Sequence, residues 1–344
     1  MKLNRLISMV LALLFGVAAG PAWAGGELNL YNWTNYTPPE LLQKFEKETG
    51  IKVTLDTYDS NETLLAKLKS GASGYDAVVI SGDFVPIFVA QNLIQPIDAA
   101  KLNGFSNLKP KWQKRDWDPD ARFTIPWVWG ITSYTVDTAV FKGPTDSLKP
   151  LFEPPPELQG KLGMLGSPTE VMSLALLYLG KPECNTEPAD LQALNALLQA
   201  QRPFVKVYNS DGIIERQSSG ETAIHQQWSG SALRSRFELP SLKFVYAKEG
   251  AVGFMDNLAV PSSARNVENA KLFVSFMMQP ENAAMLSAFT GYPNAVAGSD
   301  AFLDAKYAKA PEFNPPDDVK LTFIPTCSAQ TIKAYDRIWT KLRQ

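Results

Sequence analysis

Residues 28 to 36 are Leu28-Asn29-Leu30-Tyr31-Asn32-Trp33-Thr34-Asn35-Tyr36, the pattern of a short β-strand that ends in aromatic side chains with small hydrogen-bonding neighbours. Aromatic rings present negative π-faces that attract ammonium groups, by about 0.5–1 kcal/mol when exposed and about 2 kcal/mol when desolvated. Ligands of open α/β sheets gather beyond the carboxyl ends of strands. The segment therefore predicts a site for a cation or a sugar, with packing of the rings in the core as the alternative.

The pattern that follows this strand alternates helices with strands. Residues 37–40 predict a capping box with proline at the first helical position, and Gly50 ends this helix. Alternating apolar residues predict a strand at 51–55, residues 60–62 open a second amphipathic helix, and residues 75–80 have the composition of a strand buried on both faces. This β-α-β-α-β order predicts a mainly parallel sheet covered by helices.

The carboxyl ends of these strands place two loops, 33–36 and 81–84, on one rim of the predicted sheet. The same order of elements resumes between residues 205 and 231, which predicts a second α/β lobe. The apolar segments 125–131 and 253–261 have the character of extended passages between the lobes. Two such crossings predict a hinge.

The first residues have the features of a secretory signal peptide. Lys2 and Arg5 precede an apolar run at 6–19, and Ala22-Trp23-Ala24 supplies a small-x-small cleavage pattern. An uncleaved anchor is the alternative, but the run is short for a membrane span. No cysteine follows the cleavage site directly, which favours a freely diffusing, exported protein in a periplasm-like space over a lipid-anchored one.

The length of the remaining chain is typical of two domains. We expect a signal peptide at residues 1–24, a first lobe of residues 25–130 with 257–300, and a second lobe of residues 131–256 with 301–344.

The charge balance argues against a nucleic-acid partner. Without Lys2 and Arg5, 31 of the 33 Lys and Arg residues remain against 35 Asp and Glu, a net charge of −4. The chain has no run of basic residues of the kind that follows phosphates.

Cysteine and histidine are too scarce for the usual zinc sites, so we expect no metal. Cys184 and Cys327 are the only cysteines, and in an oxidising compartment one bridge between them is predicted, although sequence cannot show their separation. His225, the only histidine, lies in a strand pattern where a structural role is expected, and no Gly-x-Ser-x-Gly elbow or phosphate-binding glycine loop is present. We expect neither a catalytic residue nor a cofactor.

Several motifs together resemble the spermidine- and putrescine-binding periplasmic proteins of ABC importers. The resemblance runs in collinear order from about residue 27 to the C-terminus. It rests on residues 32–36, 45–53, 58–62, 228–231, 248–251, 255–256 and 291–293.

The resemblance implies a two-lobed periplasmic-binding-protein fold of type II, with each lobe a mainly parallel sheet and the ligand in the cleft between lobes. It implies aromatic rings around the ligand and carboxylates at its amine ends. The positions that match the family's contacts are Trp33, Thr34, Tyr36, Ser81, Glu170, Trp228, Ser231, Phe254, Asp256 and Tyr292.

The chain also departs from the family pattern. Asn35 is uncharged where many family members carry Asp or Glu, and Ser231 is uncharged where some members carry Asp. Ser167 occupies the position at which one type of member has a second acid. Asp83 adds a carboxylate in the second loop, and Arg234 lies one helical turn after Ser231 on the same face. Asn35, Asp83 and Arg234 are therefore candidate contacts as well.

An ammonium taken from water needs a carboxylate and other acceptors to replace its hydration. Asp256, Glu170 and Asp83 could bind the ammonium groups of putrescine or spermidine. We expect the protein to be a monomer that delivers this ligand to an inner-membrane ABC permease. If Arg234 points inward, it could instead pair with the carboxylate of an ω-amino acid such as 4-aminobutyrate. A secreted glycoside hydrolase with paired carboxylates is the remote alternative.

Overall fold

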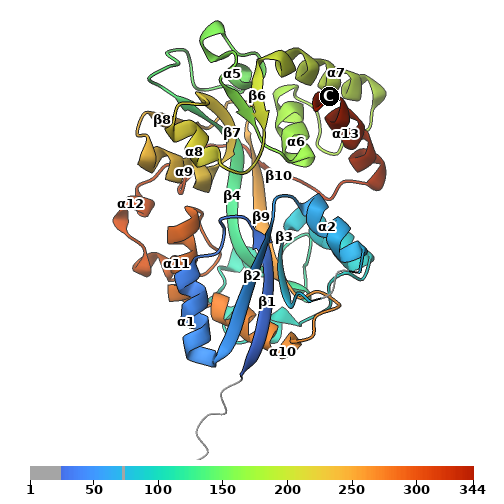
Figure 1. Cartoon of the computed structure of the whole chain (residues 1–344), viewed down its shortest axis with the longest axis vertical. Coiled ribbons are helices and arrows are strands. Elements are labelled where there is room, and N and C mark those ends of the chain that lie inside the picture. The colour runs from blue at the N-terminus through green and yellow to red at the C-terminus, as the bar shows by residue number, and fades with distance from the viewer. Residues whose placement is uncertain (1–24, 72–73) are drawn as a thin grey trace, which may run out of the picture.

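The computed structural model describes residues 25–71 and 74–344, so the predicted signal peptide lies outside the described residues. The described strands form one sheet in the order β2-β1-β3-β9-β4-β7-β5-β6, with β8 beside β4 and β10 beside β9. Figure 1 shows helices around the two halves of this sheet, with β4 and β9 running from one half to the other. We call the half that holds β1–β3 the first lobe and the half that holds β5–β8 the second lobe.

The strands are β1 (Gly26–Trp33), β2 (Ile51–Tyr58), β3 (Ala77–Ser81), β4 (Thr124–Asp137), β5 (Leu162–Met164), β6 (Val205–Tyr208), β7 (Ile224–Trp228), β8 (Leu242–Val245), β9 (Ala251–Ala259) and β10 (Leu321–Phe323). The α-helices are α1 (Pro39–Thr49), α2 (Asn61–Lys69), α3 (Val85–Ala90), α4 (Pro110–Gln113), α5 (Lys149–Phe152), α6 (Pro168–Tyr178), α7 (Pro188–Gln201), α8 (Ile213–Ser218), α9 (Ser229–Glu238), α10 (Val267–Met277), α11 (Pro280–Thr290), α12 (Ala305–Ala308) and α13 (Ala329–Leu342). None of the described helices has the length and apolar composition needed to cross a membrane.

The predicted β-α-β-α-β order of the first lobe is confirmed. β1 pairs in parallel with β2 on one side and with β3 on the other. The α1 helix ends at Gly50, which adopts the left-handed conformation (φ 74°) that glycine tolerates best. The α2 helix begins after Ser60, whose hydroxyl accepts a hydrogen bond from the Thr63 amide. These helices cover the sheet because their apolar stripes bury Leu41 and Leu64 against it.

The predicted capping box at residues 37–40 is wrong. The cap residue of α1 is Pro38, which has no side chain that could accept the amide hydrogen bonds. The Thr37 hydroxyl is instead the acceptor of a 2.7 Å hydrogen bond from the Asn32 side chain. The Thr37 hydroxyl therefore links the end of β1 to the start of α1 and does not cap the helix. Of the two predicted features of the helix start, only the proline at the first helical position is present.

Two long strands connect the lobes, and they pair antiparallel with each other. β4 places Ile125 in the apolar core of the first lobe and Val136 in the core of the second. β9 does the same with Leu258 and Val252. Because these strands belong to both cores, the sheet is continuous across the molecule. The pairs that β1 forms with β2 and β3, that β5 forms with β6 and β7, and that β10 forms with β9 are parallel.

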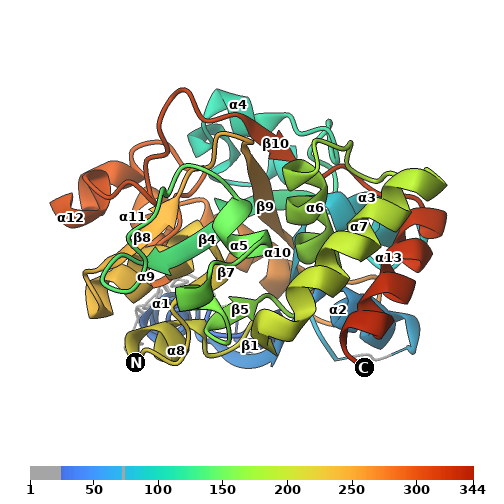
Figure 2. The ribbon, with the colours of Figure 1, turned by 90° about the horizontal axis from the view of Figure 1, so that it is seen from above.

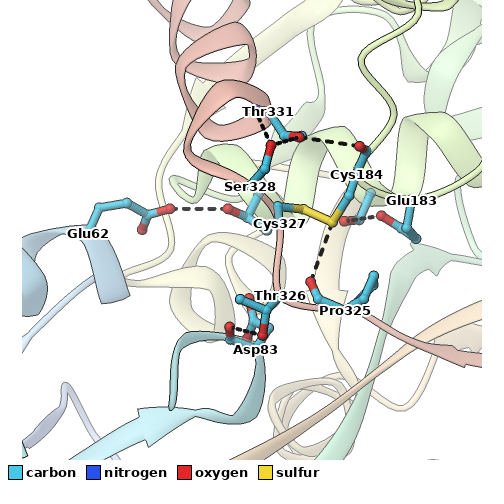
Figure 3. Close-up of a disulfide and its surroundings, with 11 residues drawn as sticks. Glu62, Asp83, Glu183, Cys184, Pro325, Thr326, Cys327, Ser328 and Thr331 are labelled. Carbon is cyan, nitrogen blue, oxygen red and sulfur yellow. Dashed lines mark hydrogen bonds between the residues drawn. A yellow bond between two sulfur atoms is a disulfide. The ribbon is translucent and has the colours of Figure 1, made fainter. Parts of the chain in front are cut away.

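The C-terminal segment packs on the second lobe. Helix α13 lies against α6 and α7 and buries Tyr335 and Trp339 in their core (Figure 2). Ahead of it, Cys327 forms a disulfide with Cys184, 143 positions earlier, with the two Cα atoms 5.1 Å apart. Figure 3 shows this cross-link beside Thr326, whose hydroxyl donates a 2.8 Å hydrogen bond to the carbonyl oxygen of Asp83 in the first lobe. The disulfide thus holds a segment of the second lobe that contacts the first.

Candidate functional site

A cavity of about 300 Å³ lies between the lobes, at the carboxyl ends of β1 and β3. The first lobe contributes the loops 33–36 and 81–84, and the second contributes the first turns of α6 and α9. Its lining includes every contact residue that the sequence predicted: Trp33, Thr34, Asn35, Tyr36, Ser81, Asp83, Glu170, Trp228, Ser231, Arg234, Phe254, Asp256 and Tyr292. Side chains that are far apart in the sequence therefore meet in one hollow.

Asp256 projects from β9 and is only 4% exposed. Its two carboxylate oxygens accept hydrogen bonds from the Tyr36 hydroxyl (2.6 Å) and the Ser81 hydroxyl (2.7 Å). Burial raises the pKa of Asp256 to about 6, although these hydrogen bonds favour the charged form and oppose the shift. The carboxylate is thus held in place by two first-lobe hydroxyls, and no cation of the described chain is among the groups that act on it.

Glu170 lies in the first turn of α6, where the helix dipole favours an acid. One carboxylate oxygen accepts a 3.2 Å hydrogen bond from the Trp228 indole, whereas the buried Oε2 atom has no hydrogen-bond partner. Burial raises the pKa of Glu170 to about 7, although the Thr132 and Trp228 side chains favour its charged form, and the charge of Asp256 adds to the rise. A buried oxygen without a partner is costly, so this acid has the capacity to receive a hydrogen-bond donor from a ligand.

Asp83 adds a third acid to the cavity. Burial raises the pKa of Asp83 well above its usual value, and the charges of Glu170 and Glu62 raise it further. Glu62 is on α2 and accepts a 3.2 Å hydrogen bond from the Thr169 hydroxyl of the second lobe. The charges of Glu170 and Glu62 thus disfavour ionisation of Asp83, and a bound cation would relieve that repulsion.

Aromatic rings form much of the cavity wall. Trp33 lies 4.5 Å from Tyr58, and Tyr292 lies edge-on to both Tyr36 (5.7 Å) and Phe254 (5.6 Å), measured between ring centroids. A methyl group in place of the Gly230 hydrogen would stand 2.6 Å from the Tyr292 ring, so glycine at this position is required for the ring to lie there. Such a wall suits methylene groups and ammonium groups alike.

Arg234 is the one basic residue in the described lining. Its guanidinium donates a 3.5 Å hydrogen bond to the Asn35 carbonyl oxygen and lies 5.4 Å from the centre of the Phe289 ring. Within the described chain, the guanidinium forms no ion pair with a carboxylate. Nearby, the Ser231 and Tyr292 hydroxyls are 3.3 Å apart. The acid whose charge acts on Arg234 is Glu215, an exposed residue that also lines the cavity.

The sequence did not identify several parts of the wall. Phe323 and Ile324 reach the cavity from the C-terminal segment, and Trp117 reaches it from a loop of the first lobe. No local pattern marks these three residues as contacts. Asp211 and Glu215 also line the cavity. They follow β6, and ligands of α/β sheets gather beyond the carboxyl ends of strands, so the sequence could have indicated these two residues.

Comparisons with known proteins agree with this geometry. Residues 40–315 match the model of the bacterial extracellular solute-binding protein family. The chain belongs to this family. As a solute-binding protein, it is 37% identical to the spermidine/putrescine-binding periplasmic protein of Escherichia coli over 294 residues, which are 85% of this chain and 84% of that protein.

Further relatives of this solute-binding protein cover nearly its whole length. The putrescine-binding periplasmic protein SpuD of Pseudomonas aeruginosa is 34% identical, with 99% of both chains covered. The structure of the spermidine/putrescine ABC transporter substrate-binding protein PotD from Streptococcus pneumoniae superposes with a TM-score of 0.77 at 26% identity, covering 93% of this chain and 99% of that one. The predicted two-lobed, type II binding-protein fold and the predicted family are thus confirmed.

The described residues contain no group of three or more His, Cys, Asp or Glu side chains arranged to hold a metal ion. His225 lies in β7, fully buried, with its Nδ1 atom 2.7 Å from the Gln226 carbonyl oxygen. Burial lowers the pKa of His225 to about 3, so the ring is neutral at ordinary pH. It does not belong to the cavity lining.

Proposed function

We propose that this solute-binding protein captures a polyamine, putrescine or spermidine, in the cavity between its lobes and delivers it to an ABC permease. The single observation that carries the proposal is the buried carboxylate of Asp256, fixed by Tyr36 and Ser81 and lacking a protein cation. A buried charge is stable only when it is paired, and an ammonium group supplies both the charge and the hydrogen-bond donors.

The other acids extend the same argument to a second nitrogen. Glu170 has a buried oxygen without a partner, and its charge disfavours ionisation of Asp83. Two positive charges would neutralise these groups, while the rings of Trp33, Trp228 and Phe254 enclose the methylenes between them. The relatives whose names include spermidine or putrescine support the same ligand class.

The proposal also covers the cellular location and the oligomeric state of the protein. We propose that residues 1–24 are removed on export to the periplasm, that the protein acts as a monomer, and that it performs no chemistry on its ligand. We also propose the division into lobes of residues 25–130 with 257–300 and 131–256 with 301–344. The ligand biases an equilibrium between open and closed lobes because only the closed state offers contacts from both.

One observation favours a second candidate ligand. The Arg234 guanidinium lines the cavity without a carboxylate partner, so it could bind the carboxylate of an ω-amino acid while Asp256 binds the amine. In that case, Arg234→Ala would eliminate the binding of 4-aminobutyrate.

Calorimetric titration with putrescine, spermidine, agmatine and 4-aminobutyrate tests both candidates. We expect saturable binding of at least one polyamine, together with a rise in melting temperature, because a ligand that binds only the folded state stabilises it. Tight binding of 4-aminobutyrate without binding of any polyamine would replace the first candidate by the second. Release of reducing sugar from glycosides would instead support a hydrolase.

A further inference from the structure

A C-terminal segment, residues 323–327, lies along the cavity and contacts both lobes. We call it the C-terminal strap. It starts at the last residue of β10, which pairs in parallel with β9, and it ends before Ser328, the cap residue of α13. Residues 324–327 belong to no helix or strand. The course of the strap between β10 and α13 is therefore not set by the backbone hydrogen bonds of a sheet or a helix.

The start of the strap forms part of the cavity wall. Phe323 and Ile324 both line the cavity. The Phe323 ring lies edge-on to Trp112 of the first lobe, with 6.1 Å between the ring centroids. A methyl group in place of the Gly253 hydrogen would stand 3.2 Å from the Phe323 ring, so this ring packs directly on the backbone of the shared strand β9.

The end of the strap is tied to both lobes. The disulfide joins Cys327 to Cys184, which lies between α6 and α7 of the second lobe. Next to it, the Thr326 hydroxyl donates its 2.8 Å hydrogen bond to the Asp83 carbonyl oxygen of the first lobe (Figure 3). Thr326 is exposed, so water competes for this hydrogen bond unless the strap is held in place. The disulfide supplies that hold by a covalent bond.

We infer that the Cys184–Cys327 disulfide is a positioning element for ligand binding, because it holds the strap as one wall of the cavity. The inference rests on the proposed function, since it assumes that the cavity binds a polyamine. A strap that is already fixed loses no conformational freedom when the ligand binds, whereas a free strap has to be ordered, and this cost lowers the affinity. The fixed Phe323 ring then presents an apolar face to methylene and ammonium groups. The disulfide thus raises affinity through Phe323, in addition to stabilising the fold.

The test is calorimetric titration with putrescine and with spermidine of the wild type, Cys184→Ser/Cys327→Ser, Phe323→Ala and the combined triple variant. Phe323→Ala should weaken binding about three- to thirtyfold, the range that a cation–π contact gives. The double cysteine variant, at a temperature at which it is folded, should bind at least about fivefold more weakly, the factor that ordering a single residue costs. The triple variant should lose little beyond the larger of these two effects, because both changes remove the same wall.

Further variants separate positioning from a general loss of stability. Trp33→Ala removes a wall ring whose neighbour is Tyr58 and not the strap, so its effect should add to that of the double cysteine variant. Pro325→Gly loosens the exposed strap but keeps the disulfide, and it should weaken binding about two- to fivefold. Pro144→Gly is the matched control, since it changes an exposed loop outside the cavity lining, and it should leave the affinity unchanged.

The outcomes distinguish the inference from the proposed function. Wild-type affinity in the double cysteine variant, or effects of the cysteine and Phe323 changes that simply add, would overturn the inference and leave the proposed function standing. If the double cysteine variant does not fold, Pro325→Gly and its combination with Phe323→Ala decide by the same two criteria. A wild type that binds neither amine would overturn the proposed function and the inference with it.

Discussion

The Tyr36 hydroxyl donates a 2.6 Å hydrogen bond to the Asp256 carboxylate across 220 positions of sequence. Tyr36 follows β1, whereas Asp256 belongs to β9, one of the two strands shared by both lobes. Ser81, at the end of β3, completes the arrangement with a second hydrogen bond. The charge that we propose to bind an ammonium group is therefore fixed by the sheet itself, before any ligand arrives.

Replacing Asp256 should lower polyamine affinity without lowering the stability of the folded protein. Asp256→Asn keeps a side chain that can bond to Tyr36 and Ser81 but removes the charge, so we expect polyamine affinity to fall about 100-fold or more. The folded protein should not be destabilised, because burial already disfavours the charged form of Asp256. Calorimetry and thermal unfolding measure the two effects. Asp317→Asn, at an exposed position, is the control, and near-normal affinity in Asp256→Asn would exclude this role.

Polyamine affinity should rise with pH between about 5 and 8. In the empty cavity, the pKa of Asp256 is raised to about 6 and that of Glu170 to about 7, so both carboxyls bind protons in the lower half of this range. An ammonium ligand needs the charged forms, and each protonated acid weakens binding up to about tenfold per pH unit. Calorimetry in buffers of different ionisation enthalpy should detect proton release near pH 6.5. Affinity independent of pH would show that these acids do not face the ligand.

The stability of the ligand-free protein should depend on pH with the opposite sign. The pKa of Asp256 is higher in the folded state than its ordinary value of 3.8, so its contribution is most favourable at acidic pH and is lost as pH rises through about 6. At pH 8, the cost is about 3 kcal/mol relative to a neutral side chain. Asp256→Asn should therefore unfold at a higher temperature than the wild type at pH 8 and at a similar temperature at pH 4. Comparing the two proteins cancels the effect of His225, whose lowered pKa acts in the other direction.

Thr326→Val should speed ligand release. The hydroxyl of Thr326 donates to the Asp83 carbonyl oxygen across the lobes, and an exposed hydrogen bond contributes about 0.5–1.5 kcal/mol. The dissociation rate in stopped-flow experiments should rise about two- to tenfold, with little change in melting temperature of the ligand-free protein. Thr340→Val is the matched control, since its hydroxyl bonds to Asp336 within α13. Equal release rates in both variants would show that Thr326 does not hold the lobes together.

Removing the disulfide should destabilise the fold. Cys184 and Cys327 close a loop of 143 positions, and restricting a long loop in the unfolded chain contributes about 2–5 kcal/mol. Urea unfolding of the double variant Cys184→Ser/Cys327→Ser should show this loss, and added reductant should lower the stability of the wild type alone. A free energy of unfolding equal to that of the wild type would mean that the packing of α13 anchors the segment unaided.

Much of the first lobe could be predicted locally. Gly50 and Ser60 mark helix boundaries because their backbone and side-chain chemistry acts within one turn. The capping box failed because Thr37 had a competing partner, Asn32, which only the folded backbone brings within 2.7 Å. The predicted contact residues were found mainly through family resemblance, whereas Phe323 and Ile324 escaped because a C-terminal segment carries no local signal of where it will dock.

The sequence by itself determined the alternation of strands and helices, the acidic and aromatic residues available for a site, and the family to which they belong. These features follow from periodicity and composition, which act along the chain. Only the tertiary structure decided that Glu170 and Asp256 lie close enough to Asp83 to raise its pKa, that Arg234 contacts the Asn35 carbonyl oxygen, and that a disulfide-held segment contacts the first lobe. Electrostatic coupling and packing depend on distances between residues far apart in the chain, and the shared strands β4 and β9 fix those distances when both lobes fold around them.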